Sequence, residues 1–108
     1  MIPQLTATEL AQWRADAGRR APVLVDVREP WEFELARIEG SLHVPLGTLP
    51  RSLDRLPRGE PLVLVCHHGS RSQNAAAFLV QSGFTDVHNL RGGVAAWAAE
   101  VDPTMKTY

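Results

Sequence analysis

The chain has 108 residues, and its 44% hydrophobic and 21% charged residues match those of an ordinary globular domain. These values exclude a disordered, collagen-like or coiled-coil chain. With 11 basic and 12 acidic residues the formal net charge is -1, so no overall field draws the chain to nucleic acid or to an anionic membrane. The length predicts a single domain over residues 1–108.

Targeting segments and disulfides are not expected either. The first ten residues lack the basic patch and apolar stretch of a secretory signal, and no apolar run approaches the ~20 residues of a membrane-spanning helix. The single cysteine, Cys66, has no partner for an internal disulfide, and a structural thiolate metal site normally needs more cysteines. We therefore expect a cytoplasmic protein in which Cys66 is either core filler or a nucleophile.

The predicted elements begin with a helix that has clear boundary signals. Thr6, followed by Glu9 three residues later, forms a capping box, and Gly18 is a suitable stop. Beyond it, short apolar runs typical of buried strands alternate with helical segments. The expected strands are 23–27, 42–44, 62–65 and 86–90. The expected helices are 29–33, 49–56, 73–82 and a final one that begins at Gly92-Gly93.

This alternation predicts an α/β fold with a mainly parallel central sheet of about five strands and helices on both faces. In such sheets, ligands bind beyond the carboxyl ends of the strands. Cys66 directly follows the apolar strand 62–65 and precedes a helix, so we expect it at such an end. The loop amides, the amino end of the helix and the guanidinium of Arg71 would together favour a thiolate there.

The residues after Cys66 decide between a core cysteine and a nucleophile. A core cysteine should be followed by apolar or turn-forming residues. Cys66 is followed instead by two histidines, a glycine, a serine and an arginine. We therefore interpret Cys66 as a nucleophile.

A resemblance to a known family begins at this loop. Its sequence is similar to the active-site loop of rhodanese domains, the thiosulfate and persulfide sulfurtransferases, and reads Cys66-His67-His68-Gly69-Ser70-Arg71-Ser72. Three further segments resemble family signatures in the same order along the chain: Asp26-Val27-Arg28-Glu29, residues 38–45, and Leu90-Arg91-Gly92-Gly93 with Trp97. The combination identifies the chain as a member of the rhodanese-like family, with the fold that this implies.

The resemblance implies a two-step sulfur transfer. Cys66 would take the outer sulfur of thiosulfate or of a persulfide donor, hold it as a persulfide, and pass it to a thiol or to cyanide. The loop from His67 to Ser72 would bind the substrate, and neither a metal nor an organic cofactor would be needed. The expected partners are a thiosulfate-like donor and a thiol acceptor, which includes a sulfur-carrier protein.

Two alternatives stay open at this stage. One is a persulfide-carrier or interaction module that turns over thiosulfate poorly. The other is a phosphatase, because related phosphatases have a similar loop. Those loops are one residue longer, C-x5-R, whereas Cys66 to Arg71 is C-x4-R. The shorter loop suits one sulfur atom better than a tetrahedral phosphate and favours sulfur transfer.

Several neighbouring residues have more than one interpretation. His67 and His68 do not make a metal site with Cys66, since three consecutive residues rarely converge on one ion; we expect them at the rim of the loop. Arg71 either binds an anionic donor or fixes the loop through carbonyls or acids. Ser70 and Ser72 can donate hydrogen bonds to an anion, and Ser72 is equally suited to a helix start.

Asp26 and Arg28 lie at the end of a neighbouring predicted strand. We expect them to form a structural ion pair or turn bond beside the site rather than to take part in catalysis. Arg28 is also within reach of an anionic donor in this arrangement.

Overall fold

A computed structural model describes residues 1–108. Its centre is a five-stranded parallel sheet, which confirms the predicted α/β class and the expected sheet. The strands, in the spatial order β1-β5-β4-β2-β3, are β1 (Gln4–Leu5), β5 (Val87–Leu90), β4 (Leu62–Val65), β2 (Val23–Asp26) and β3 (Leu42–His43). The edge strand β1 was not expected, whereas the other four match the predicted runs to within one residue at each end.

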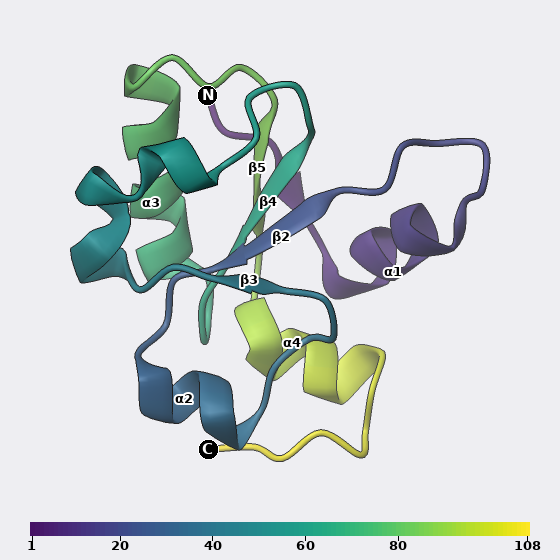
Figure 1. The fold of residues 1–108 in the computed structure, drawn as a ribbon. Coiled ribbons are helices and arrows are strands. Elements are labelled where there is room, and N and C mark those ends of the chain that lie inside the picture. The colour runs from purple at the N-terminus through teal and green to yellow at the C-terminus, as the bar shows by residue number, and fades with distance from the viewer.

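The helices cover both faces of this sheet (Figure 1). They are α1 (Ala7–Ala15), α2 (Pro30–Leu35), α3 (Ser70–Gln81) and α4 (Gly93–Glu100), with two 3-10 helices, η1 (Leu46–Arg51) and η2 (Leu53–Arg55). None of them combines the length and the apolar character needed to cross a membrane.

Strand β4 shows how the alternation of side chains divides the core into two layers. Leu62 and Leu64 belong to a cluster with the apolar residues of α3, while Val63 and Val65 belong to a second cluster with residues of α1 and α4. All four side chains are buried, as expected for a central strand of a parallel sheet. Figure 1 shows α3 and α1 on opposite sides of the sheet, with α4 near the carboxyl end of β5.

Two predicted helices differ from the structure for local reasons. Helix α1 has the predicted capping box but ends at Ala15, because the carboxylate of Asp16 accepts the N–H of Gly18 and draws the chain into a turn. The segment 49–56 is not one helix but parts of η1 and η2. The two 3-10 helices meet at Ser52, whose backbone (φ −120°, ψ 13°) leaves the helical region and interrupts the segment.

Helix α3 begins three residues earlier than predicted, at Ser70 rather than Gln73. The residue before it, Gly69, has a left-handed φ of +107°, a conformation in which glycine is favoured. At the other end, the N–H of Phe84 donates to the carbonyl of Leu79 in the expected glycine-ended cap. The first turn of α3 therefore lies directly against the cysteine loop.

Candidate active site

Cys66 lies one residue beyond the carboxyl end of the central strand β4 and is 1% exposed. Its Sγ accepts two hydrogen bonds from its own loop. The backbone N–H of Gly69 donates at 3.0 Å, and the Oγ of Ser72 donates at 3.2 Å. Such donors stabilise a negatively charged sulfur, so the local geometry suits the nucleophile predicted at this position.

The amino end of α4 holds the carbonyl groups of the loop. The N–H of Val94 donates to the carbonyl of Cys66 at 2.9 Å, and the N–H of Ala95 donates to the carbonyl of His67 at 3.1 Å. In a trans peptide the C=O and N–H groups point in opposite directions. The N–H groups of His67 and His68 are therefore turned away from α4.

Gly93 makes this close approach between α4 and the loop achievable. Its φ is +57°, and a Cβ at this position would lie 2.3 Å from the carbonyl oxygen of Cys66 and 2.4 Å from that of His67. No side chain fits at those separations. The absence of a side chain at Gly93 thus allows α4 to pack directly on the cysteine loop.

Most amides of the loop are free to bind a ligand. The N–H group of Gly69 donates to Sγ, but five others form no hydrogen bond within the chain: those of His67, His68, Ser70, Arg71 and Ser72. Unpaired amides in a tight turn at a helix amino end are typical of anion-binding sites. The loop therefore has the hydrogen-bonding capacity expected for a substrate cradle.

Arg71 is fixed by an acid that the sequence did not point to. Its Nη1 and Nη2 donate to the two carboxylate oxygens of Glu32 in α2, at 2.8 and 2.9 Å. These hydrogen bonds lower the pKa of Glu32 to about 2; burial opposes them, and the N–H of Glu29 and the hydroxyl of Tyr108 add to them. The same carboxylate raises the pKa of Arg71 above its ordinary value. Of the two roles left open for Arg71, the structure displays the one that fixes the loop.

Asp26 and Arg28 form the expected structural ion pair at the end of β2. Both side chains are fully buried, and the Nη2 of Arg28 lies 2.7 Å from a carboxylate oxygen of Asp26. The guanidinium also donates to the carbonyls of Glu32 and Ala36. Although burial opposes its charge, the hydrogen bonds and electrostatic attraction of Asp26 and Tyr108 raise the pKa of Arg28. The guanidinium of Arg28 is therefore hydrogen-bonded to groups of the same chain.

The segment after α4 brings Tyr108 to the site, where Figure 1 shows the end of the chain beside α2. The Tyr108 hydroxyl accepts from Arg28 at 2.8 Å and donates to Glu32 at 2.9 Å. Its ring stacks on His67, with ring centroids 4.0 Å apart, and burial raises the Tyr108 pKa. Tyr108 therefore connects the buried ion pair, the Arg71 carboxylate and the cysteine loop.

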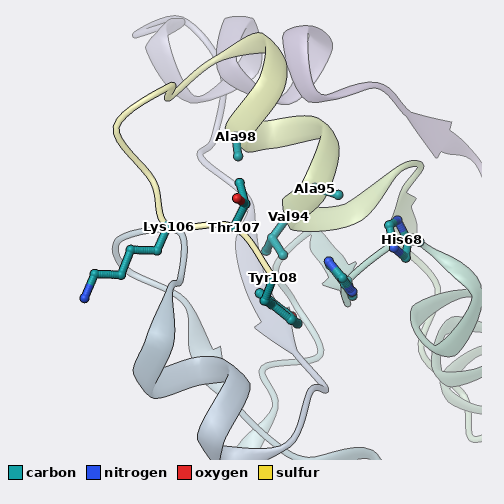
Figure 2. Close-up of a pocket in the computed structure, with 8 residues that line it drawn as sticks. His68, Val94, Ala95, Ala98, Lys106, Thr107 and Tyr108 are labelled. Carbon is teal, nitrogen blue, oxygen red and sulfur yellow. The ribbon is translucent and has the colours of Figure 1, made fainter.

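The two loop histidines form the wall of a cavity of about 100 Å³ beside the loop (Figure 2). Its other lining residues come from α4 and the last residues of the chain: Val94, Ala95, Ala98, Lys106, Thr107 and Tyr108.

Burial, together with the neighbouring His68, lowers the pKa of His67 below its ordinary value. Of the two histidines expected at the rim, His68 is exposed, whereas His67 is half-buried beneath the ring of Tyr108. The structure contains no group of three His, Cys, Asp or Glu side chains that could hold a metal ion.

Sequence reasoning missed three residues of the site: Glu32, Asn89 and Tyr108. Glu32 and Tyr108 contact the loop from positions 39 residues before Arg71 and 41 residues after His67, so no local pattern connects them to it. Asn89 in β5 is buried and accepts a hydrogen bond from Ser72. Its neighbour His88 is also polar, so the sequence did not distinguish Asn89 as a residue of the site.

Comparison with known proteins agrees with this geometry. The sequence matches the family model of the rhodanese-like domain over residues 6–100. The chain belongs to this family. A rhodanese-like domain protein from Staphylococcus aureus has the same fold, with a TM-score of 0.84, 26% identity and 99% of each chain covered. The family and fold predicted from the sequence are thus confirmed.

Curated relatives of similar length are named sulfurtransferases. The chain is 36% identical over 98 residues to a sulfurtransferase of Allochromatium vinosum, which covers 91% of this chain and 90% of the relative. It is 40% identical over 94 residues to the thiosulfate sulfurtransferase GlpE of Pseudomonas aeruginosa, which covers 87% of this chain and 83% of the relative. The rhodanese-type transferase class expected for this domain is thereby confirmed.

A longer relative shows the domain in another setting. The chain is 37% identical over 106 residues to the probable adenylyltransferase/sulfurtransferase MoeZ of Mycobacterium tuberculosis. The match covers 96% of this chain but only 26% of that protein.

Proposed function

We propose that the chain transfers sulfane sulfur from thiosulfate or a persulfide donor to a thiol acceptor through a persulfide on Cys66. The observation that carries the proposal is the environment of Sγ. It lies at the end of the central strand, accepts hydrogen bonds from Gly69 and Ser72, and is followed by a loop with five unpaired amides. This arrangement favours a sulfur nucleophile and a sulfur-centred anion in the same place.

In the first step the Cys66 thiolate attacks the outer sulfur of thiosulfate. A bond forms between Sγ and that sulfur, the sulfur–sulfur bond of thiosulfate breaks, and its electron pair leaves with sulfite. The terminal sulfur of the persulfide then carries the negative charge. The free amides of the loop are available to stabilise this charge by hydrogen bonding.

In the second step a thiolate acceptor attacks the terminal sulfur. A bond forms between the sulfur of the acceptor and the transferred sulfur. The bond between the transferred sulfur and Sγ of Cys66 breaks, and its electron pair returns to Sγ. Gly69 and Ser72 are placed to stabilise the thiolate that leaves, because both donate to Sγ. The exchange needs no external oxidant or reductant.

The position of Arg71 supports sulfur transfer over phosphoryl transfer. Both of its terminal nitrogens are occupied by the carboxylate of Glu32. A phosphate bound in the loop would have to compete with that carboxylate for the guanidinium. The C-x4-R spacing also keeps the loop short.

The partners follow from the same chemistry. The donor is a small anion with a sulfane sulfur, and the acceptor is a small thiol or a sulfur-carrier protein. A lone cysteine that must stay reduced to attack a donor agrees with the cytoplasmic location expected from a single cysteine.

Intact-protein mass spectrometry before and after incubation with thiosulfate tests the proposal. We expect the mass to rise by one sulfur atom, sulfite to appear in equal amount, and an acceptor thiol to reverse the change. The Cys66→Ser variant is a matched control, since the chain has no other cysteine, and it should gain no sulfur.

Two outcomes would contradict parts of the proposal. If the wild-type protein gains no sulfur from thiosulfate or from any persulfide donor, the transferase mechanism through Cys66 is wrong. If it loads rapidly from a persulfide-bearing protein but slowly from thiosulfate, the chain is a persulfide carrier rather than a thiosulfate enzyme.

A further inference from the structure

Two buried polar side chains, those of Ser72 and Asn89, lie in a row behind the reactive sulfur. Ser72 Oγ is 3.2 Å from Sγ of Cys66 and 2.5 Å from Oδ1 of Asn89 in β5. Cys66, Ser72 and Asn89 are 1%, 0% and 3% exposed, so water does not replace either contact. A serine hydroxyl has one hydrogen, and it cannot donate to both neighbours at once.

The side-chain amide of Asn89 is held in one orientation by its nitrogen. Nδ2 donates to the carbonyl of Gly69 at 3.2 Å and to Oε1 of Gln4 at 2.8 Å. A reversed amide would place its oxygen against the Gly69 carbonyl, which also accepts from the N–H of Gln73. Oδ1 therefore faces Ser72, and it can only accept.

We propose that Asn89 is a positioning residue that competes with Cys66 for the hydroxyl hydrogen of Ser72. When the sulfur is a thiol, the S–H donates to Ser72 and Ser72 donates to Asn89, so every group is satisfied. When the sulfur is a thiolate, Ser72 turns its hydrogen to Sγ and leaves Oδ1 of Asn89 without a donor. Asn89 thus lowers the stability of the thiolate relative to the thiol.

The same competition operates during turnover, and this part rests on the proposed function. Sγ of a persulfide is a neutral divalent sulfur and a weak acceptor, so Ser72 donates to Asn89 in that state. When the acceptor takes the outer sulfur, negative charge returns to Sγ and Ser72 turns back. The hydroxyl of Ser72 alternates between two acceptors once in each catalytic cycle.

Other ionisable groups near Cys66 also influence its charge. On the loop, Arg71 interacts electrostatically with Cys66. The remaining groups around this end of the sheet are His67 and His68 of the loop, Asp26 and Arg28 of the β2 end, Glu32 of α2, and Tyr108. All of them stay unchanged in the variants below, so their contribution cancels in the comparison.

The test is the rate of alkylation of Cys66 by iodoacetamide as a function of pH. The Asn89→Leu variant keeps the size of the side chain and removes the competing acceptor. We expect its pH profile to move toward acid by about half a pH unit, which makes alkylation about threefold faster on the rising part of the profile, the effect of one modest hydrogen bond.

A second pair of variants separates this route from a general loosening of the loop. In a Ser72→Ala background, Asn89→Leu should cause no further shift, because no hydroxyl is left to compete for. Gln4→Ala removes the other partner of the Asn89 amide but leaves Oδ1 in place, and its profile should match that of the wild type.

The proposal is overturned if Asn89→Leu leaves the profile in place or moves it toward alkali. It is also overturned if the shift is equally large without Ser72, or if Gln4→Ala reproduces it. Circular dichroism checks the fold of each variant, and Asn89→Ala decides the matter if the leucine variant does not fold. Alkylation needs no sulfur donor, so a failure of sulfur loading would contradict the proposed function without affecting this test.

Discussion

The carboxylate of Glu32 and the guanidinium of Arg71 face each other in parallel, joined by hydrogen bonds of 2.8 and 2.9 Å. The pair connects α2 to the first turn of α3, although 39 residues separate the two in sequence. The Glu32 side chain is 5% exposed and that of Arg71 is 36% exposed, so one partner is inside the protein and the other is at its surface. A bidentate pair of this kind sets the direction of the arginine as well as its charge.

Removing the carboxylate is expected to slow sulfur transfer. In Glu32→Ala, Arg71 loses the partner that fixes it beside the cysteine loop, and we expect the transfer rate to fall about tenfold, the factor that corresponds to ~1.4 kcal/mol in a barrier. Steady-state thiosulfate turnover measures the effect. Glu34→Ala changes an exposed acid on the same helix and should retain the wild-type rate. Equal rates in all three proteins would show that this pair has no part in turnover.

The low pKa of Glu32 predicts a loss of stability in acid. Its carboxyl has a pKa of about 2 when folded and 4.5 as a model group, so between these values the unfolded chain binds more protons. The free energy of unfolding should therefore be fully supported by this group above about pH 4.5 and should decline as the pH falls toward 2. Urea unfolding over this range should give a shallower pH dependence for Glu32→Gln than for the wild type. An unchanged slope would contradict the assignment, and Glu34→Gln serves as the control.

A methyl group at residue 93 is expected to disrupt the cysteine loop. In Gly93→Ala the new Cβ would clash with the carbonyls of Cys66 and His67 at a positive φ, so α4 or the loop must move. We expect a loss of about 1–3 kcal/mol in unfolding free energy and a large loss of sulfur loading. Gly47→Ala is the matched control, since nothing lies within 4 Å of its Cβ and its φ is not positive. Full sulfur loading by Gly93→Ala would mean that the contact with α4 does not position the loop.

The stacking of Tyr108 on His67 predicts a difference between two substitutions. Burial is the main cause of the lowered His67 pKa, and the Tyr108 ring covers one face of the imidazole. In Tyr108→Ala the pKa of His67 should rise toward 6.5, whereas in Tyr108→Phe the ring remains and the pKa should stay low. Titration of the histidine ring protons by NMR measures both. The same pKa in both variants would show that the ring does not shield His67.

Tyr108→Phe has an effect of its own on stability. It removes the hydroxyl that accepts from Arg28 and donates to Glu32. The fully buried guanidinium then loses one acceptor, and we expect a cost of about 1 kcal/mol in unfolding free energy. Thermal or urea unfolding at neutral pH measures it, and no change would show that Arg28 finds another acceptor.

The sequence was most informative where chemistry is local. The strand 62–65, the polar loop and the following helix lie next to one another in the chain, and their order alone placed Cys66 at a strand end. The capping box of α1 and the glycine-ended cap of α3 are equally local, so both were predicted. Each depends on residues that are only a few positions apart, so the sequence pattern alone predicts it.

Partners that are distant in the chain were not predictable in the same way. Glu32, Asn89 and Tyr108 reach the loop because β2, β4 and β5 are neighbours and because the last residues return to α2. Strand β1 was not predicted because a strand of two residues is too short to show a hydrophobic period. Only its pairing with β5 defines it as a strand. The segment 49–56 has helical hydrophobic spacing, but its backbone leaves the helical region at Ser52 and divides it between η1 and η2.

The contact between α4 and the loop also has a consequence for biosynthesis. The amides that orient the Cys66 and His67 carbonyls belong to Val94 and Ala95, more than two dozen residues downstream in the chain. A ribosome releases the cysteine before it releases those amides, and a domain generally folds as a unit. Until α4 docks, the carbonyls of Cys66 and His67 lack these hydrogen bonds, so the loop around the thiol is completed only after the last helix has been synthesised.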